Sequence, residues 1–198
     1  MIGNEYIHKF NRALSFNSSL ESRFTMMLLA DRNVANVREE WPRVKYRWPG
    51  ATTWHETLVD RHATYASSLR VAYSVKAIAH LGESQALDIG KLVNEQNTGE
   101  HFDLYVVVTE AQITPARSDN AEQIVIACDN RNERHCEIVL EFMRTIERPI
   151  TFMEVERTLG PDIDVNNSLL CLLYDGLVEH LSPDELFDDA PFLQTVLR

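Results

Sequence analysis

Residues 136–181, CEIVLEFMRTIERPITFMEVERTLGPDIDVNNSLLCLLYDGLVEHL, decide the fold that the sequence predicts. Thr151 stands three residues before Glu154, which is the spacing of a helix capping box. Asn166 or Asn167 can cap a further helix. Apolar side chains recur at helical spacing in three successive runs, over 136–146, 151–159 and 166–177. Three helices in this order, followed by an extended segment with turn residues, predict a winged helix-turn-helix.

Two β-branched and aromatic stretches precede these helices. Residues 102–109 read FDLYVVVT and residues 122–128 read EQIVIAC, and both are bounded by turn-forming residues. We interpret them as strands of a small antiparallel sheet. The sequence thus predicts a winged-helix-like domain over residues 99–198.

The first half of the chain has mainly helical spacing. A polar stretch at 94–100 is the expected domain boundary, which makes residues 1–98 a helical domain. The expected fold class is therefore α+β and mostly helical, with an N-terminal helical domain. Its helices are expected at 4–16, 18–37, 54–81 and 84–93.

Length and composition are those of an ordinary globular protein. The chain has 198 residues, of which 44% are apolar and 25% are charged. No apolar run approaches the roughly 18 residues that a membrane span needs, and the first residues lack a signal-peptide core, so we expect a cytoplasmic protein without membrane contact. The three cysteines have no metal-binding spacing, which argues against a disulfide or zinc framework.

The charge is concentrated in the second half. The formal net charge of the chain is −11, and residues 120–198 hold six Arg, no Lys and sixteen acidic residues, a net charge of −10. Binding to DNA depends on Lys and Arg that neutralise phosphates. The expected third helix has no basic residue, so nucleic acid is not the favoured partner of this domain.

No motif for catalysis or metal binding is complete. His55-Glu56 begins the zinc motif H-E-x-x-H, but Val59 replaces the second histidine. His62 is two helical turns from His55, too far to share one metal ion. We expect no catalytic residue, metal site or cofactor in this chain.

A loop at 41–50, WPRVKYRWPG, mixes basic and aromatic side chains. Such a mixture can stack on nucleic-acid bases or form a protein interface, and Trp rings can equally close a core. With no net positive charge around it, we favour a protein partner. The candidate partner-interface residues are Trp41, Arg43, Tyr46, Arg47 and Trp48.

The layout of the second half resembles a family of known peptide-binding elements. These are the recognition elements of ribosomally made, post-translationally modified peptides, to which the peptide chaperone of pyrroloquinoline quinone biosynthesis belongs. The whole chain is similar in layout to the partner-protein family of methanobactin biosynthesis. The resemblance is carried by FDLYVVVTEAQIT, EQIVIAC, CEIVLEFMRTI, FMEVERTLG and VNNSLLCLLYDGLVEHL.

The resemblance implies a non-catalytic subunit. Such a subunit forms a heterodimer with an iron-dependent peptide-modifying oxygenase, which holds the iron, and binds the leader of a precursor peptide as an added strand. The residues that this would assign to peptide binding are Ile124, Ile126, Asp129, Glu133, Leu169 and Leu173, although the apolar ones fit a core equally well. Alternatives are a winged-helix DNA-binding regulator, an acidic inhibitor that mimics nucleic acid, and, last, an enzyme.

Overall fold

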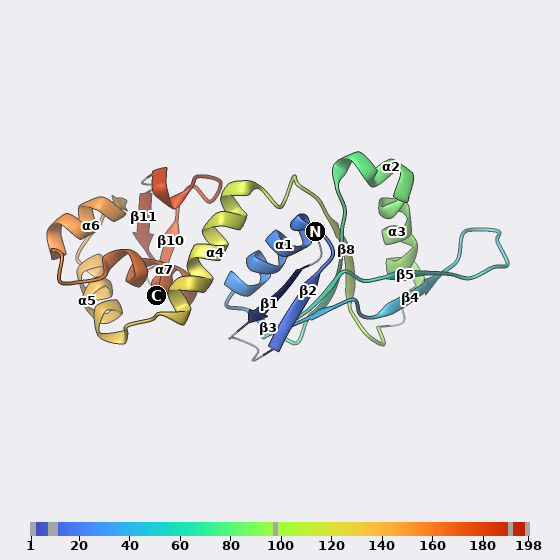
Figure 1. Ribbon diagram of the computed structural model, residues 1–198, viewed down its shortest axis with the longest axis horizontal. Coiled ribbons are helices and arrows are strands. Elements are labelled where there is room, and N and C mark those ends of the chain that lie inside the picture. The colour runs from blue at the N-terminus through green and yellow to red at the C-terminus, as the bar shows by residue number, and fades with distance from the viewer. Residues whose placement is uncertain (1–2, 8–11, 97–98, 190–191, 197–198) are drawn as a thin grey trace. The chain divides into compact units, whose positions relative to one another are not determined.

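The computed structural model describes residues 3–7, 12–96, 99–189 and 192–196 (Figure 1). The chain forms two compact units. The first comprises Met1–Leu28 and Asn33–Ile113, and the second comprises Leu29–Arg32 and Thr114–Arg198. The division after residue 113 differs from the boundary expected at 98/99, because residues 99–113 contribute a strand to the sheet of the first unit.

A four-stranded mixed sheet is the centre of the first unit. Its strand order is β3-β6-β7-β8, with antiparallel pairs except for the parallel pair β7–β8. A parallel pair needs a crossover, and the helices between β7 and β8 provide it. The strands are β3 (Val34–Glu39), β6 (Arg61–Tyr65), β7 (Arg70–Val75) and β8 (Leu104–Val108).

Helices lie against the two faces of this sheet (Figure 1). The ring of Phe24 in α1 (Ser19–Ala30) meets Tyr73 on β7 edge to face, with centroids 4.9 Å apart. The neighbouring Ala72 instead belongs to a core cluster with Leu92 and Val93 of α3 (Ala86–Gln96). Because successive strand residues point to opposite faces, α1 and α3 cover opposite sides. The short η2 (Ile78–His80) and α2 (Leu81–Ser84) precede α3.

Two hairpins complete the first unit. β1 (Gly3–Ile7) pairs with β2 (Arg12–Phe16), and β4 (Arg43–Tyr46) pairs with β5 (His55–Leu58). The β4–β5 hairpin and its loop project from the rest of the unit (Figure 1). The Trp41–Pro42 peptide bond before β4 is cis.

The sequence predicted a helical N-terminal domain, and this prediction is wrong. The range 4–16 contains strands β1 and β2, with residues 8–11 outside the described part, and the helix expected over 18–37 ends at Ala30 and is followed by β3. The range 54–81 contains β5, β6 and β7. Its apolar residues fit helical spacing, but RHATY and RVAYSV pair across a tight turn in which Ser68 has φ +70°. The pairing of β6 and β7 with each other and with β3 and β8 outweighed the helical spacing of their apolar residues. The expected helix at 84–93 and strand at 102–109 correspond to α3 and β8.

The second unit packs four helices with a small sheet. The sheet has the order β10-β11-β9 with antiparallel pairs. A single core cluster unites the unit, centred on Val139, Val155, Leu169 and Leu193, each with 0% of its surface exposed. The elements, in chain order, are α4 (Pro115–Asp129), α5 (Glu133–Arg144), β9 (Ile150–Thr151), α6 (Phe152–Leu159), α7 (Val165–Asp175), β10 (Val178–His180), η3 (Phe187–Asp189) and β11 (Phe192–Thr195).

Local signals explain most of these helices, and two expectations were wrong. The capping box at Thr151 and Glu154 is present in both of its hydrogen bonds. Helix α7 is capped by Asp164, rather than by the asparagines that follow it. The range 122–128 is not a strand but the second half of α4, which begins with Thr114 as N-cap and Pro115 in its first turn. An N-cap threonine followed by a proline in the first turn favours a helix start, and the β-branched residues of 122–128 continue that helix.

The chain is thus α+β, with helices and strands in both units. Across the described ranges, no helix has the length and apolar character required to cross a bilayer.

Candidate functional site

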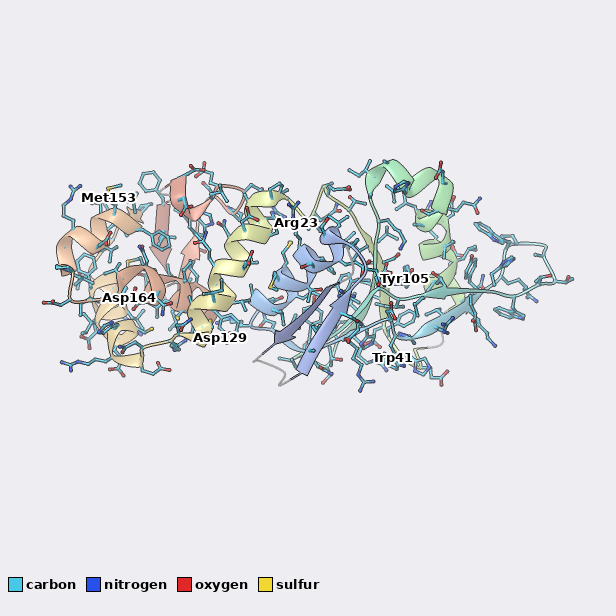
Figure 2. All side chains as sticks on the ribbon, in the orientation of Figure 1. Arg23, Trp41, Tyr105, Asp129, Met153 and Asp164 are labelled. Carbon is cyan, nitrogen blue, oxygen red and sulfur yellow. The ribbon has the colours of Figure 1, made fainter. Side chains whose placement is uncertain are left out.

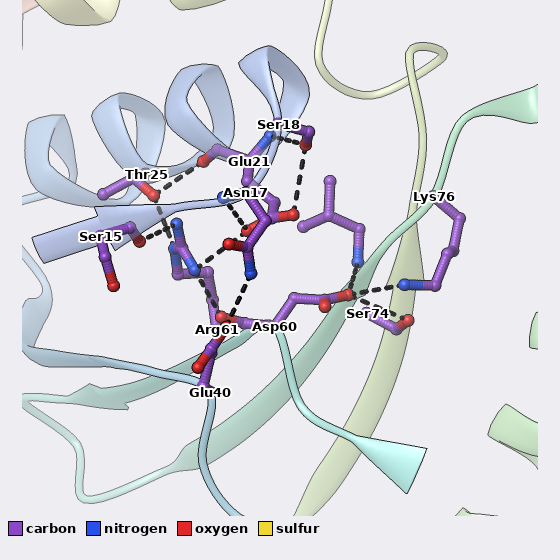
Figure 3. Close-up of polar contacts among 11 residues, drawn as sticks. Ser15, Asn17, Ser18, Glu21, Thr25, Glu40, Asp60, Arg61, Ser74 and Lys76 are labelled. Carbon is purple, nitrogen blue, oxygen red and sulfur yellow. Dashed lines mark hydrogen bonds and ion pairs between the residues drawn. The ribbon is translucent and has the colours of Figure 1, made fainter. Parts of the chain in front are cut away.

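Polar side chains gather where β6 begins and β7 ends (Figure 3). One carboxylate oxygen, Oδ2 of Asp60, accepts hydrogen bonds from three groups. These are Nζ of Lys76 at 3.0 Å, the backbone N–H of Val75 at 2.8 Å and Oγ of Ser74 at 3.3 Å. We call Asp60, Ser74 and Lys76 the Asp60 cluster.

The sheet itself brings this cluster together. The backbone N–H of Asp60 donates to the carbonyl of Tyr73 on the antiparallel neighbour β7 at 3.0 Å. The backbone N–H of Lys76 donates to the carbonyl of Val108 on β8, also at 3.0 Å. The side chains of Lys76 and Asp60 are 33% and 18% exposed, so both charged groups are partly buried but reach the surface.

Arg61, the next residue, carries a buried charge. Its guanidinium donates to Oγ1 of Thr25 at 2.7 Å and to the carbonyls of Ser15 at 2.9 Å and Asp60 at 2.6 Å. It also pairs with Oε2 of Glu21 at 3.4 Å. Burial lowers the pKa of Arg61 below its usual range, against the opposing effect of Glu21. Several hydrogen bonds and a counter-ion are what a buried charge requires.

Glu21 connects this buried charge to the start of α1. Its side chain accepts a hydrogen bond from Oγ of Ser18 at 3.2 Å, and its backbone N–H donates back to that oxygen at 3.2 Å. The sequence spacing of Ser18 and Glu21 therefore marks a true helix start. Arg61 contacts both the Glu21 carboxylate and the Asp60 carbonyl, so α1 and the Asp60 cluster are joined through one guanidinium (Figure 3).

The basic-aromatic loop divides its residues between core and surface. Tyr46 is 6% exposed and belongs to a core cluster, against which Trp48 is partly buried. Trp41 is half-buried, and the centroid of its ring lies 4.8 Å from that of His62. Arg43 and Arg47 are exposed. Of the five residues considered for a partner interface, the two arginines thus offer their side chains fully to a partner.

The residues considered for peptide binding do not form one surface on a sheet edge. Ile124, Ile126 and Asp129 lie on helix α4, not on a strand, because 122–128 is helical. Asp129, labelled in Figure 2, is the last residue of that helix. Leu169 is fully buried in the core of the second unit, and Leu173 packs against that core. The acidic residue at the start of α5 is paired instead with a neighbouring arginine, in the ion pair of Glu133 with Arg131.

An open pocket of about 280 Å³ lies in the second unit among α4, α6, α7 and η3. Apolar side chains from three of these elements, Phe152, Leu170 and Phe187, line it together with Met153, which is 55% exposed. The remaining lining residues are Gln123, Glu156, Asn166 and Asp188.

Sequence reasoning missed the Asp60 cluster because its members fell within an expected helix. A helix would place Asp60 and Lys76 about 24 Å apart, at 1.5 Å per residue. The signal available was the β-branched and aromatic content of RHATY and RVAYSV on either side of a Ser-Ser turn. This signal places an acid before the first strand and a lysine after the second.

In the part of the chain that the structure describes, no three His, Cys, Asp or Glu side chains gather closely enough to enclose a metal ion. The chain matches no protein-family model and no curated protein.

Proposed function

We propose that the first unit hydrolyses phosphodiester bonds of nucleic acid with the help of a divalent metal ion at the Asp60 cluster. One observation carries this proposal: a partly exposed carboxylate and a partly exposed lysine ammonium meet at 3.0 Å, at the adjoining ends of two central strands. Carboxylates bind Mg²⁺, and a lysine cation stabilises the charge that develops on a phosphoryl group.

The residues fit a metal that is only partly held by protein. Mg²⁺ usually keeps several water ligands and is bound by one or two carboxylates together with substrate phosphates. The Asp60 carboxylate could supply one such ligand, and this kind of site needs no all-protein cage. The hydroxyl of Ser74 is buried and donates to that carboxylate, so it holds Asp60 in place. When bound, the metal would supply a polarised phosphoryl oxygen and an activated water.

Each residue then has a separate role on this proposal. Asp60 holds the cation and is itself held by the backbone N–H of Val75. Lys76 exchanges part of its contact with Asp60 for a non-bridging phosphate oxygen. Arg61, fixed by Thr25 and Glu21, acts through the backbone of Asp60 and is a positioning residue.

The proposal departs from the non-catalytic chain expected from sequence. That expectation rested on the lack of a complete catalytic motif and on the family resemblance, and the helix expected over 54–81 would have kept Asp60 and Lys76 apart. Because β6 and β7 occupy this range as antiparallel neighbours, Asp60 and Lys76 come together across the strand pair.

Cleavage of a labelled 30-base-pair duplex and of the matching single strand tests the proposal. The full chain should cleave at least one of them with Mg²⁺ or Mn²⁺ and not with EDTA. Asp60→Asn and Lys76→Ala should each lower the rate by at least about 100-fold, as expected for loss of a group that stabilises transition-state charge. Lys91→Ala, which removes an exposed charge from α3, is the matched control. Metal-dependent cleavage that survives Asp60→Asn would contradict the proposal.

For the second unit we propose a winged-helix arrangement. The chain order α5-β9-α6-α7-β10-β11 with the sheet order β10-β11-β9 supports it. The two strands after the third helix pair with each other, and the second of them pairs with the short strand after the first helix. Its net charge of −10 over residues 120–198 favours a basic or peptide partner over DNA.

The accessory-subunit function implied by the family resemblance is a second candidate, and the pocket beside α6 favours it. Phe152, Met153 and Phe187 offer apolar contacts, and Glu156 and Asp188 could pair with a lysine of a precursor leader. Titration with a lysine-bearing leader peptide tests it. Binding that Met153→Asp abolishes would support this function, and no binding at millimolar peptide would reject it.

A further inference from the structure

We infer that the exposed face of the β4–β5 hairpin is a nucleic-acid-binding arm that holds the substrate backbone leading to the Asp60 cluster. This inference rests on the proposed function and deepens it. The evidence is the distribution of charge on the hairpin, its anchoring and its place next to Asp60.

The two faces of β4 differ sharply in chemistry. Val44 and Tyr46, with Trp48 just beyond the strand, join the core cluster that includes Leu92 and Val93 of α3. The intervening residues on the opposite face, Arg43, Lys45 and Arg47, are all exposed. This alternation follows the period of two of a strand. It displays three cations in a row on one side of the hairpin.

The row is locally basic although the whole chain is acidic. Between Trp41 and His55 the sequence has three basic residues and no acidic one. The acid opposite this row is Glu56, which is in register with Lys45 and lies 4.0 Å from Arg43. At that distance, with the Arg43 side chain 71% exposed, the pair is weak. The cations therefore stay available to a phosphate backbone.

The spacing of the cations fits a nucleic-acid strand. Alternate residues of a strand are about 6.6 Å apart, so the row from Arg43 to Arg47 spans about 13 Å. That distance equals the axial rise of about four base-pair steps of a duplex, at about 3.4 Å each. An exposed aromatic ring adds a stacking surface at the far end: Trp54 is 55% exposed, and the guanidinium of Arg47 lies 5.0 Å from its ring centroid.

The row is held in place before any ligand arrives. The side chain of Gln96 at the end of α3 clamps the backbone of Arg47, accepting from its N–H at 2.9 Å and donating to its carbonyl at 2.8 Å. Tyr46 stacks on His55 of the paired strand, with centroids 5.6 Å apart. A pre-ordered surface loses less entropy on binding.

The base of the hairpin adjoins the candidate site. β5 ends at Leu58, two residues before Asp60, and the N–H of Val59 donates to the carbonyl of Pro42 at 3.2 Å. A backbone that follows Arg47, Lys45 and Arg43 is thus led towards Asp60. The protein partner that the sequence favoured for this loop becomes the alternative outcome of the test.

Binding measurements in EDTA, from 50 to 300 mM salt, test the inference. The protein is the full chain carrying Asp60→Asn, and the ligands are a 30-base-pair duplex, the same single strand and the matching RNA. Replacing Arg43, Lys45 and Arg47 together by Gln should reduce the salt slope of log K by about 0.9 per lost contact on duplex, or about 0.7 on a single strand. Glu56→Gln should tighten binding to the same ligand, and Trp54→Ala should weaken single-strand binding more than duplex binding.

Arg134→Gln on the acidic second unit removes one positive charge outside the hairpin and is a control that should leave the slope unchanged. Circular dichroism of the triple variant checks that the hairpin still forms. An unchanged slope in the folded triple variant, or no binding of any of the three ligands, overturns the inference. The first result leaves metal-dependent cleavage by the Asp60 cluster intact. If the protein never cleaves nucleic acid but the triple variant binds it less tightly, the proposed function is rejected and the inference that the hairpin binds nucleic acid stands.

Discussion

At the scale of single residues, Arg61 is the group on which the first unit most depends. Its side chain has no exposed surface, and its donors reach α1, the residues before α1 and the backbone of Asp60. The sequence shows the capping pair Ser18 and Glu21 but not the arginine that uses Glu21 as a counter-ion. That contact joins positions forty residues apart, and no local pattern encodes it.

Arg61→Met should destabilise the protein by about 3–5 kcal/mol, because it leaves Glu21 buried without its counter-ion. Adding Glu21→Gln, which removes that unpaired charge while keeping a residue suited to the capping box, should restore part of the loss. Urea denaturation of the two single variants and the double variant measures the coupling. Additive losses in the double variant would show that the two side chains do not interact.

At the scale of elements, local signals sufficed for some segments and failed for others. The capping box at Thr151 fixed the start of α6, and the amphipathic run after residue 136 fixed α5. The segments 54–81 and 122–128 failed for opposite reasons. In the first, strand pairing across the sheet outweighed a helical spacing of apolar residues. In the second, a Thr-Pro helix start outweighed the β-branched run that follows it.

The start of α6 should be sensitive to acid. Hydrogen bonds from Arg148, and then from the backbone of Thr151, lower the pKa of Glu154 from 4.5 to about 2. The ionised Glu154 carboxylate therefore stabilises the folded state at pH values above about 4.5, the ordinary pKa. This stabilisation is lost as the pH falls from about 4.5 to about 2. NMR titration of the Glu154 carboxylate measures it, and Arg148→Gln should move the pKa back towards 4.5. A native pKa near 4.5 in the unmodified protein would contradict the contact.

At the scale of the whole molecule, charge and chemistry are divided between the two units. The first carries the Asp60 cluster and the cationic row of the β4–β5 hairpin. The second carries nearly all the excess negative charge and a core of its own. Composition alone revealed the charge division. The Asp60 cluster could not be predicted in the same way, because it exists only once two strands have been paired correctly.

Binding of Mn²⁺, followed by the loss of the free-ion electron paramagnetic resonance signal, tests the central claim most directly. Mn²⁺ reports on sites that prefer carboxylate and water oxygens, as Mg²⁺ does. The full chain with a 30-nucleotide DNA strand should bind more Mn²⁺ than the strand alone, and Asp60→Asn should remove that excess while DNA affinity in EDTA stays unchanged. Equal Mn²⁺ binding by the unmodified protein and by Asp60→Asn would contradict the claim that Asp60 holds the catalytic metal.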